Sequence, residues 1–170
     1  MSARPDEARV SLPSDTEVEV TRAFNAPRDL VWKAYTTPDL VQRWLLGPPG
    51  WTMPVCEMDV RVGGDFRWVW KAEEDGQQFG FHGRFLEVLA PSRIVHSEIY
   101  DAGDVGGSMG EGGESTVVVT LDEEDGVTTL TTLIDYGSKE ARDAVVSTGM
   151  TEGMEMSYKQ LDELLGAGVD

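Results

Sequence analysis

The sequence has few of the residues that commonly bind metals or form covalent intermediates. Its one cysteine, Cys56, excludes an intramolecular disulfide and cannot by itself form a cysteine zinc site. The two histidines, His82 and His96, show no His-x-His or Glu-x-x-His spacing, and no nucleophile elbow, phosphate loop or dinucleotide fingerprint occurs. We therefore expect no metal and no cofactor, and we interpret both histidines as structural.

Long apolar runs are also absent. No stretch approaches the ~20 residues that a bilayer-spanning helix needs, so membrane insertion is not expected. Residues 1–14 hold charges and prolines where a secretory signal would need an apolar run. These residues are predicted to form a flexible leader, and the protein is expected to be cytoplasmic.

Basic residues are scarce relative to acidic ones. The chain has 14 Lys and Arg against 31 Asp and Glu, which gives a formal net charge of −17. A molecule so acidic repels polyphosphates, so nucleic-acid binding is not expected. The charge indicates an acidic protein kept in solution by its surface, with an acidic docking surface for a partner as the alternative.

What the sequence does contain is a series of short periodic segments. Residues 16–24 alternate polar and apolar side chains and predict a strand, and two proline-containing cap signals then predict two short helices before the loop 47–50. Further segments predict six more strands and one long helix: 52–62, 65–71, 78–89, 93–100, 115–121 and 127–136 as strands, and 139–165 as the helix. This order predicts an α+β fold in one domain over 15–166, with a tail at 167–170.

Several motifs in this order resemble a known family. They are Arg22-Ala23-Phe24-Asn25-Ala26-Pro27 with Val31-Trp32, Trp44, the stretch 59–67 around Gly63-Gly64, the stretch 83–88 leading to 91–95, and the closing helix from Thr148-Gly149-Met150 to Leu164-Leu165. Together they are similar to the activator-of-heat-shock-protein-90-ATPase homologue (AHSA-like) family of the START-like, or SRPBCC, superfamily. The resemblance covers about 16–165, and the stretch 59–67 is its most specific part.

The resemblance implies a helix-grip fold, in which a curved, mostly antiparallel seven-stranded sheet surrounds a long C-terminal helix. Members of the wider superfamily bind lipids, hormones or polyketides in the cavity between sheet and helix, and some are cyclases or hydratases. The family takes its name from a eukaryotic co-chaperone, but this chain has no room for the additional chaperone-binding domain. A chaperone partner is therefore only an alternative.

The aromatic and methionine residues are the candidates for contact with a small apolar ligand. Alternation places Phe66, Trp68 and Trp70 on one face of their strand, and methionines on the last helix would adapt to an irregular ligand. The alternative is a packed core without a cavity. The full set of candidate ligand-binding residues is Trp44, Trp51, Phe66, Trp68, Trp70, Phe81, Phe85, Met150, Met154 and Tyr158.

Two further features bear on function. Residues 101–114 contain six glycines, typical of a loop that could be a lid or a tolerated insertion. His96, Glu98 and Tyr100 share a strand face, but polar rows of this kind usually face water. We therefore predict a small-molecule-binding protein and no catalytic residue, with two alternatives: a cyclase- or hydratase-type enzyme using a cavity histidine or carboxylate, and a chaperone-associated protein.

Overall fold

The computed structural model describes residues 7–101 and 114–167. In chain order the elements are β1 (Arg9–Ser11), β2 (Glu17–Phe24), α1 (Arg28–Thr36), α2 (Pro38–Trp44), β3 (Trp51–Met58), β4 (Asp65–Ala72), β5 (Gln78–Leu89), β6 (Arg93–Asp101), β7 (Glu114–Glu124), β8 (Val127–Asp135), α3 (Lys139–Val146) and α4 (Met150–Ala167). This confirms the predicted α+β fold and the two short helices after the first long strand.

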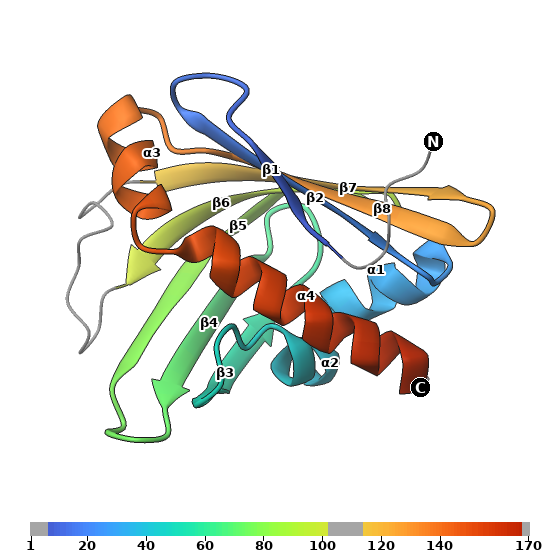
Figure 1. Ribbon diagram of the computed structural model, residues 1–170, viewed down its shortest axis with the longest axis horizontal. Coiled ribbons are helices and arrows are strands. Elements are labelled where there is room, and N and C mark those ends of the chain that lie inside the picture. Colours follow the sequence, from blue (N-terminus) through green and yellow to red (C-terminus); the bar gives the residue numbers. More distant parts are fainter. Residues whose placement is uncertain (1–6, 102–113, 168–170) are drawn as a thin grey trace.

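The strands form one curved antiparallel sheet in the order β1-β2-β8-β7-β6-β5-β4-β3. The sheet bends around α4, which crosses its concave side together with α1 and α2 (Figure 1). Short turns join most neighbouring strands, as antiparallel pairing allows, whereas β2 pairs with β8 far along the chain. The helix-grip architecture expected from the family resemblance is therefore present.

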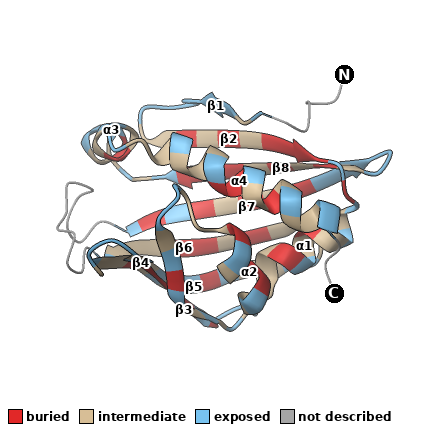
Figure 2. Ribbon diagram, turned by 60° about the horizontal axis from the view of Figure 1, so that its bottom comes forward, coloured by how far each residue is buried: buried red, intermediate tan, exposed pale blue. Residues whose placement is uncertain are grey.

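One face of the sheet is buried and the other faces water. Burial alternates along β7 and β8 so that every second residue is buried, as expected for an antiparallel sheet covered on one side (Figure 2). The buried residues of β2, β7 and β8 meet Leu161 and Tyr158 of α4. The core thus lies between the concave face of the sheet and the helices.

The sheet has eight strands where seven were predicted. The additional strand is β1, which lies within the predicted leader and pairs with residues 19–21 of β2. It is three residues long and Val10 is 49% exposed, so no apolar alternation marked it in the sequence. The predicted strand 52–62 also proved too long, because β3 ends at Met58 and a hydrogen-bonded turn follows.

The long helix predicted over 139–165 is two helices. Ser138 is the N-cap of α3, and its hydroxyl accepts a hydrogen bond from the Ala141 amide at 3.1 Å. The chain then breaks at Gly149, whose φ of +84° lies in the left-handed region that glycine adopts at least cost. The apolar stripe runs through both helices, so periodicity alone did not reveal the break.

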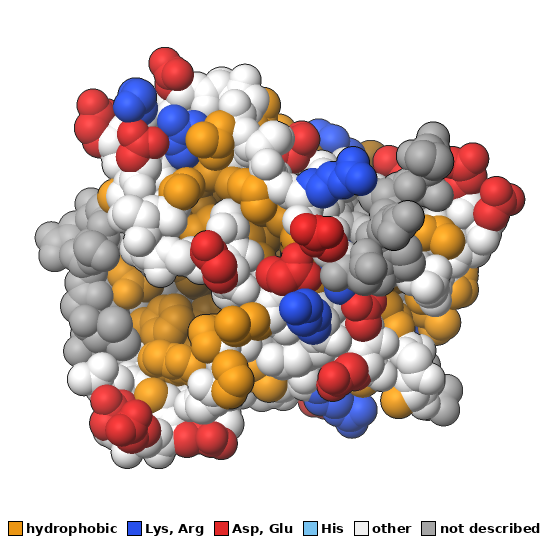
Figure 3. All heavy atoms as spheres, viewed as in Figure 1, with side chains coloured by type: hydrophobic (Ala, Val, Ile, Leu, Met, Phe, Trp, Pro, Cys, Tyr) orange, Lys and Arg blue, Asp and Glu red, His pale blue; other side chains and the backbone are white. Residues whose placement is uncertain are grey.

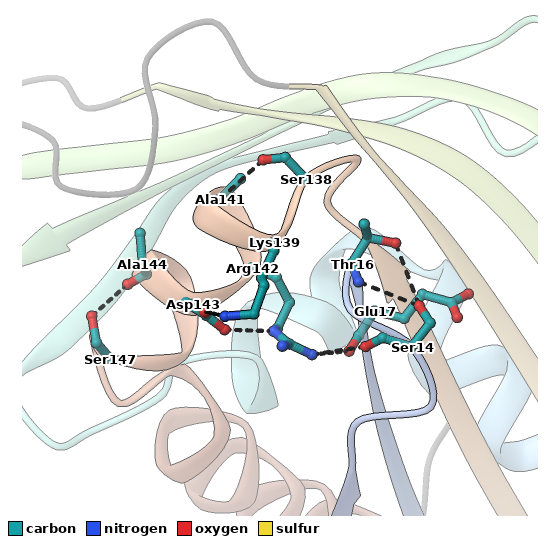
Figure 4. A network of polar contacts seen from close by, with 10 residues as sticks. All are labelled: Ser14, Thr16, Glu17, Ser138, Lys139, Ala141, Arg142, Asp143, Ala144 and Ser147. Carbon is teal, nitrogen blue, oxygen red and sulfur yellow. Dashed lines mark hydrogen bonds and ion pairs between the residues drawn. The ribbon is translucent and has the colours of Figure 1, made fainter.

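A buried arginine fastens α3 to the segment before β2. The guanidinium of Arg142 donates hydrogen bonds to the backbone carbonyls of Ser14 and Glu17, at 2.9 and 3.3 Å, and its Nε pairs with Asp143 (Figure 4). Lys139 also pairs with Asp143 one turn away. This network therefore joins α3 to the start of β2.

A second buried arginine fastens α4 to the sheet. Arg22 of β2 has no exposed surface, and its guanidinium pairs with Asp162 at 2.5 Å and with Glu155 at 3.6 Å, both on α4. It also lies over the ring of Phe24, 4.9 Å from its centroid. Glu155 and Asp162 therefore hold α4 over β2.

Candidate functional site

A row of partly exposed aromatic rings lies on the concave face of β4, β5 and β6. Strand pairing places Trp68 opposite Phe81 and Phe81 opposite Tyr100, so all three side chains share that face. The rings touch in sequence: Trp70 stacks on Phe79 at 5.4 Å, and Phe81 meets Tyr100 at 5.4 Å. We call Trp51, Trp70, Phe79, Phe81 and Tyr100 the aromatic row.

The surface is recessed at this place. Figure 3 shows hydrophobic side chains gathered in a hollow over β4 and β5, beside α4. Except for Trp70, which is 8% exposed, the aromatic row is half-buried, as are Met150 and Met154, which pack against the core from the first turns of α4. We call this recess the aromatic hollow. Its lining is apolar and incompletely covered, which suits an apolar ligand.

His96 of β6 lies beneath the aromatic side chains of β4 and β5. It is buried among Phe66, Trp68 and Phe85, with ring centroids at 4.8, 6.2 and 6.0 Å. Burial lowers the pKa of His96 to about 4, opposed in part by a hydrogen bond between its Nδ1 and the Ser97 carbonyl. The imidazole is therefore neutral at physiological pH and acts as a packed core side chain.

Glu98, two residues along β6, shares the concave face with His96 and Tyr100. The sequence left the orientation of this polar row open, and the structure shows that the row faces the helices rather than water. Burial raises the pKa of Glu98 to about 7, and no residue that the structure describes donates a hydrogen bond or offers an ion pair to its carboxyl group. Glu98 is nevertheless half-buried, which places its carboxyl in a concave, partly accessible environment.

Tyrosines approach Glu98 from two other elements. Tyr35 comes from α1 and Tyr136 directly follows β8; burial raises the pKa of both, and the charge of Glu98 adds to each rise. Tyr158 of α4 lies beyond them, 3.4 Å from the Thr132 hydroxyl, and burial raises its pKa to about 12. These hydroxyls are protonated at neutral pH and can donate hydrogen bonds.

The structure divides the candidate ligand-binding residues into two groups. Trp51 and Phe81 are half-buried members of the aromatic row, Trp70 is a buried member, and Met150 and Met154 are half-buried where α4 packs against the core. The others are core residues with less than a tenth of their surface exposed: Trp44, Phe66, Trp68, Phe85 and Tyr158. Trp44 illustrates the second group, since its indole Nε1 donates to the Ala34 carbonyl at 2.9 Å and its ring stacks on Tyr158.

Trp68 differs from the other core aromatic residues in one respect. Its indole Nε1 is buried and has no hydrogen-bond partner in the described part of the chain. A buried donor without a partner costs free energy, so positions of this kind often face a water or ligand that completes them.

His82 lies on the opposite face of the sheet. It is exposed, beside Arg67 and Arg84, in a depression of about 510 Å³ on the convex side. A second depression of about 490 Å³ lies at the end of β3, where Trp51 meets Pro49 and Gly50. Both depressions are open to solvent and rich in charged residues, so we place the candidate site in the concave hollow instead.

Three other expectations concern a metal site, a membrane span and the glycine-rich segment. Within 7–101 and 114–167, no cluster of three or more His, Cys, Asp or Glu could hold a metal ion, and no helix is long and apolar enough to cross a membrane. Residues 102–113, most of the glycine-rich segment predicted as a lid or an insertion, lie outside the described residues.

The list of candidate ligand-binding residues left out Phe79, Tyr100, Tyr35 and Tyr136, and the sequence left open which side of the sheet Glu98 faces. Alternation along β5 and β6 was sufficient to place Phe79 and Tyr100 on faces with Phe81 and Glu98. Which residues of β6 lie on the concave face depends on how β6 pairs with β5, and a single sequence does not reveal this pairing. Tyr35 and Tyr136 come from a helix and a loop, and only the fold brings them near Glu98.

Known proteins resemble this chain in both sequence and fold. The family model described as "Activator of Hsp90 ATPase homolog 1-like protein" matches residues 25–166. No curated protein has a significant sequence match.

Solved structures show the same fold over nearly the whole chain. A protein from Rhodobacter sphaeroides is 36% identical, with 95% of this chain and 100% of that chain covered and a TM-score of 0.86. Protein Ms6760 from Mycobacterium smegmatis is 27% identical, with 96% and 100% covered and a TM-score of 0.82. CalU16 from Micromonospora echinospora, 22% identical with 88% and 81% covered and a TM-score of 0.61, shares the fold. On the family match and the first of these relatives, the chain belongs to the Activator of Hsp90 ATPase homolog 1-like family.

Proposed function

We propose that the protein binds a small, largely apolar molecule in the aromatic hollow. The observation that carries the proposal is the row of contacting, half-buried aromatic rings on the concave face, open to the surface beside α4. Monomeric proteins seldom leave contiguous aromatic surface uncovered without a use for it.

The shape and flexibility of the walls also support this proposal. The aromatic row is rigid, because Trp70 is held by a 2.7 Å hydrogen bond from its Nε1 to the Leu45 carbonyl. Met150 and Met154 lie in the first turns of α4, just after the break at Gly149. A rigid aromatic wall facing flexible methionines accommodates planar ligands of different outline.

A thermal-shift screen against lipids, quinones and polyketide-like aromatics tests the proposal. We expect at least one class to raise the melting temperature in a concentration-dependent way. Phe81→Ala should lose the response, whereas Leu86→Ala should keep it, because Leu86 lies on the same strand but is 49% exposed. A panel without any stabilising compound would contradict the proposal.

One observation favours a second candidate function, an enzyme of the cyclase or hydratase type. Glu98 lies on the concave face with its pKa raised to about 7 by burial, which suits a general acid or base near neutral pH. Incubation with cyclisable or hydratable compounds and mass spectrometry should then show turnover that Glu98→Gln abolishes. Turnover unaffected by that substitution would contradict this role. A chaperone partner is suggested by the family name alone.

A further inference from the structure

The carboxyl group of Glu98 lacks a counter-charge. It lies on the concave face beside the aromatic row, and the described ion pairs do not include it. The two arginines buried on this side of the sheet pair with other groups. Arg22 is paired with Asp162 and Glu155, and Arg142 with Asp143 and two backbone carbonyls.

The groups that surround Glu98 are neutral. On its own strand are His96, whose pKa burial lowers to about 4, and Tyr100. Its neighbours across the strand pairs are Gly83 of β5, which follows from the pairing of His82 with Ile99, and Ser115 of β7.

From the other elements come Tyr35 of α1, Tyr136 after β8 and Tyr158 of α4, all with raised pKa values. Glu155 of α4 is already paired with Arg22. The hydroxyls can accept or donate hydrogen bonds, but none of these groups carries the positive charge that a carboxylate favours.

The aromatic row adds a second feature that favours a cation. The rings of Trp70, Phe79, Phe81 and Tyr100 contact one another within 6.2 Å between centroids and present a continuous aromatic wall. The faces of such rings attract cations, most strongly where water is displaced. The net charge of −17 raises the local concentration of cations around the whole molecule.

We propose that the ligand of the aromatic hollow is an amine, with its ammonium group paired to the Glu98 carboxylate and its apolar part packed on the aromatic row. This inference rests on the proposed ligand-binding function and adds the chemical class of the ligand. No covalent step is involved. Where Glu98 is protonated in the free protein, binding of the ammonium releases that proton to solvent.

Two aromatic probes of matched shape test the proposal, 2-naphthylmethylamine as the cation and 2-naphthylmethanol as its neutral counterpart. Their affinities are measured by calorimetry with the full chain at pH 6 and at pH 8, on either side of the value of about 7 at which Glu98 titrates. We expect the amine to bind about tenfold more tightly than the alcohol at pH 8. The preference should shrink at pH 6, because Glu98 is then largely protonated.

Glu98→Gln should remove the preference for the amine and leave the affinity of the alcohol within about twofold. Glu124→Gln is the matched control, since it makes the same change in net charge at an exposed position at the end of β7. It should keep the preference. If Glu98→Gln does not fold, the pH dependence of the preference in the unaltered protein remains decisive.

Equal affinity for the amine and the alcohol at pH 8 would overturn the amine proposal while supporting the hollow as a binding site. A preference that persists in Glu98→Gln would also overturn it, because surface charge would then explain the result. If neither probe nor any compound of the thermal-shift panel binds, the proposed ligand-binding function itself fails.

Discussion

Glu98 is a carboxyl residue on the concave face, where the groups that surround it are neutral. Its neighbours on β6 are His96, which burial keeps neutral, and Tyr100, which belongs to the aromatic row. An apolar side chain at position 98 would serve packing better, since burial of a carboxyl without a partner costs free energy. The presence of glutamate here is therefore more consistent with a ligand contact than with stability.

This cost predicts a stability that depends on pH. Burial raises the pKa of Glu98 from its ordinary 4.5 to about 7, so between these values the folded state keeps a proton that the unfolded state has lost. Stability therefore falls as the pH rises through this interval. Relative to Glu98→Gln, the unaltered protein should lose about 3 kcal/mol of unfolding free energy between pH 4.5 and pH 8.

Urea unfolding of both proteins at several pH values measures this difference. His96 and all other titrating groups are common to the two proteins, so their contributions largely cancel. A difference between the two proteins that stays constant with pH would show that Glu98 is well solvated, in contradiction to its position in the hollow.

At the scale of elements, the two halves of α4 have different surroundings. The C-terminal half is fixed by the pairing of Asp162 with Arg22 and by Leu161, which has no exposed surface. The N-terminal half begins after the Gly149 break and carries the half-buried methionines. The helix is thus anchored at one end and borders the hollow at the other.

Substitutions of two glycines, one at the break between α3 and α4 and one inside α4, should have opposite effects on stability. Gly149→Ala should destabilise the protein by roughly 1 kcal/mol, because its φ of +84° strains any residue with a Cβ atom. Gly153→Ala should stabilise it by roughly 0.5–1 kcal/mol, because Gly153 is inside α4 with nothing within 4 Å of an added Cβ. Thermal unfolding compares them, and equal effects of the two substitutions would contradict a fixed break at Gly149.

The Arg22 ion pairs should matter more than surface pairs. Arg22→Met leaves Asp162 and Glu155 of α4 without their cation, and we expect a loss of about 3 kcal/mol. Adding Asp162→Asn and Glu155→Gln should recover part of it, since no uncompensated carboxylate then remains. Chemical denaturation measures both variants. A triple variant less stable than Arg22→Met would contradict this explanation.

At the scale of the whole molecule, the sequence predicted the fold better than the site. Proline caps and alternation predicted α1, α2 and seven of the strands, because these signals are local. They missed β1, which is short and exposed, and the break at Gly149, which the apolar stripe bridges.

The candidate site depends on non-local pairing, which explains why its prediction was incomplete. Trp70 and Phe81 could be assigned to one wall from alternation, but Tyr35 and Tyr136 reach Glu98 only through the folded arrangement of α1 and β8. The same arrangement places Trp44, one of the candidate ligand-binding residues, in the core, where it is 1% exposed.

The most direct test of the central claim is a nuclear magnetic resonance titration of the isotope-labelled protein with 2-naphthylmethanol. Binding in the aromatic hollow predicts saturable shifts in the indole N–H signals of Trp51, Trp68 and Trp70 and in the methyl signals of Met150 and Met154. The signals of His82 and Arg84 on the convex face should stay unchanged. The absence of saturable shifts at the hollow, or saturable shifts confined to the convex face, would contradict the claim.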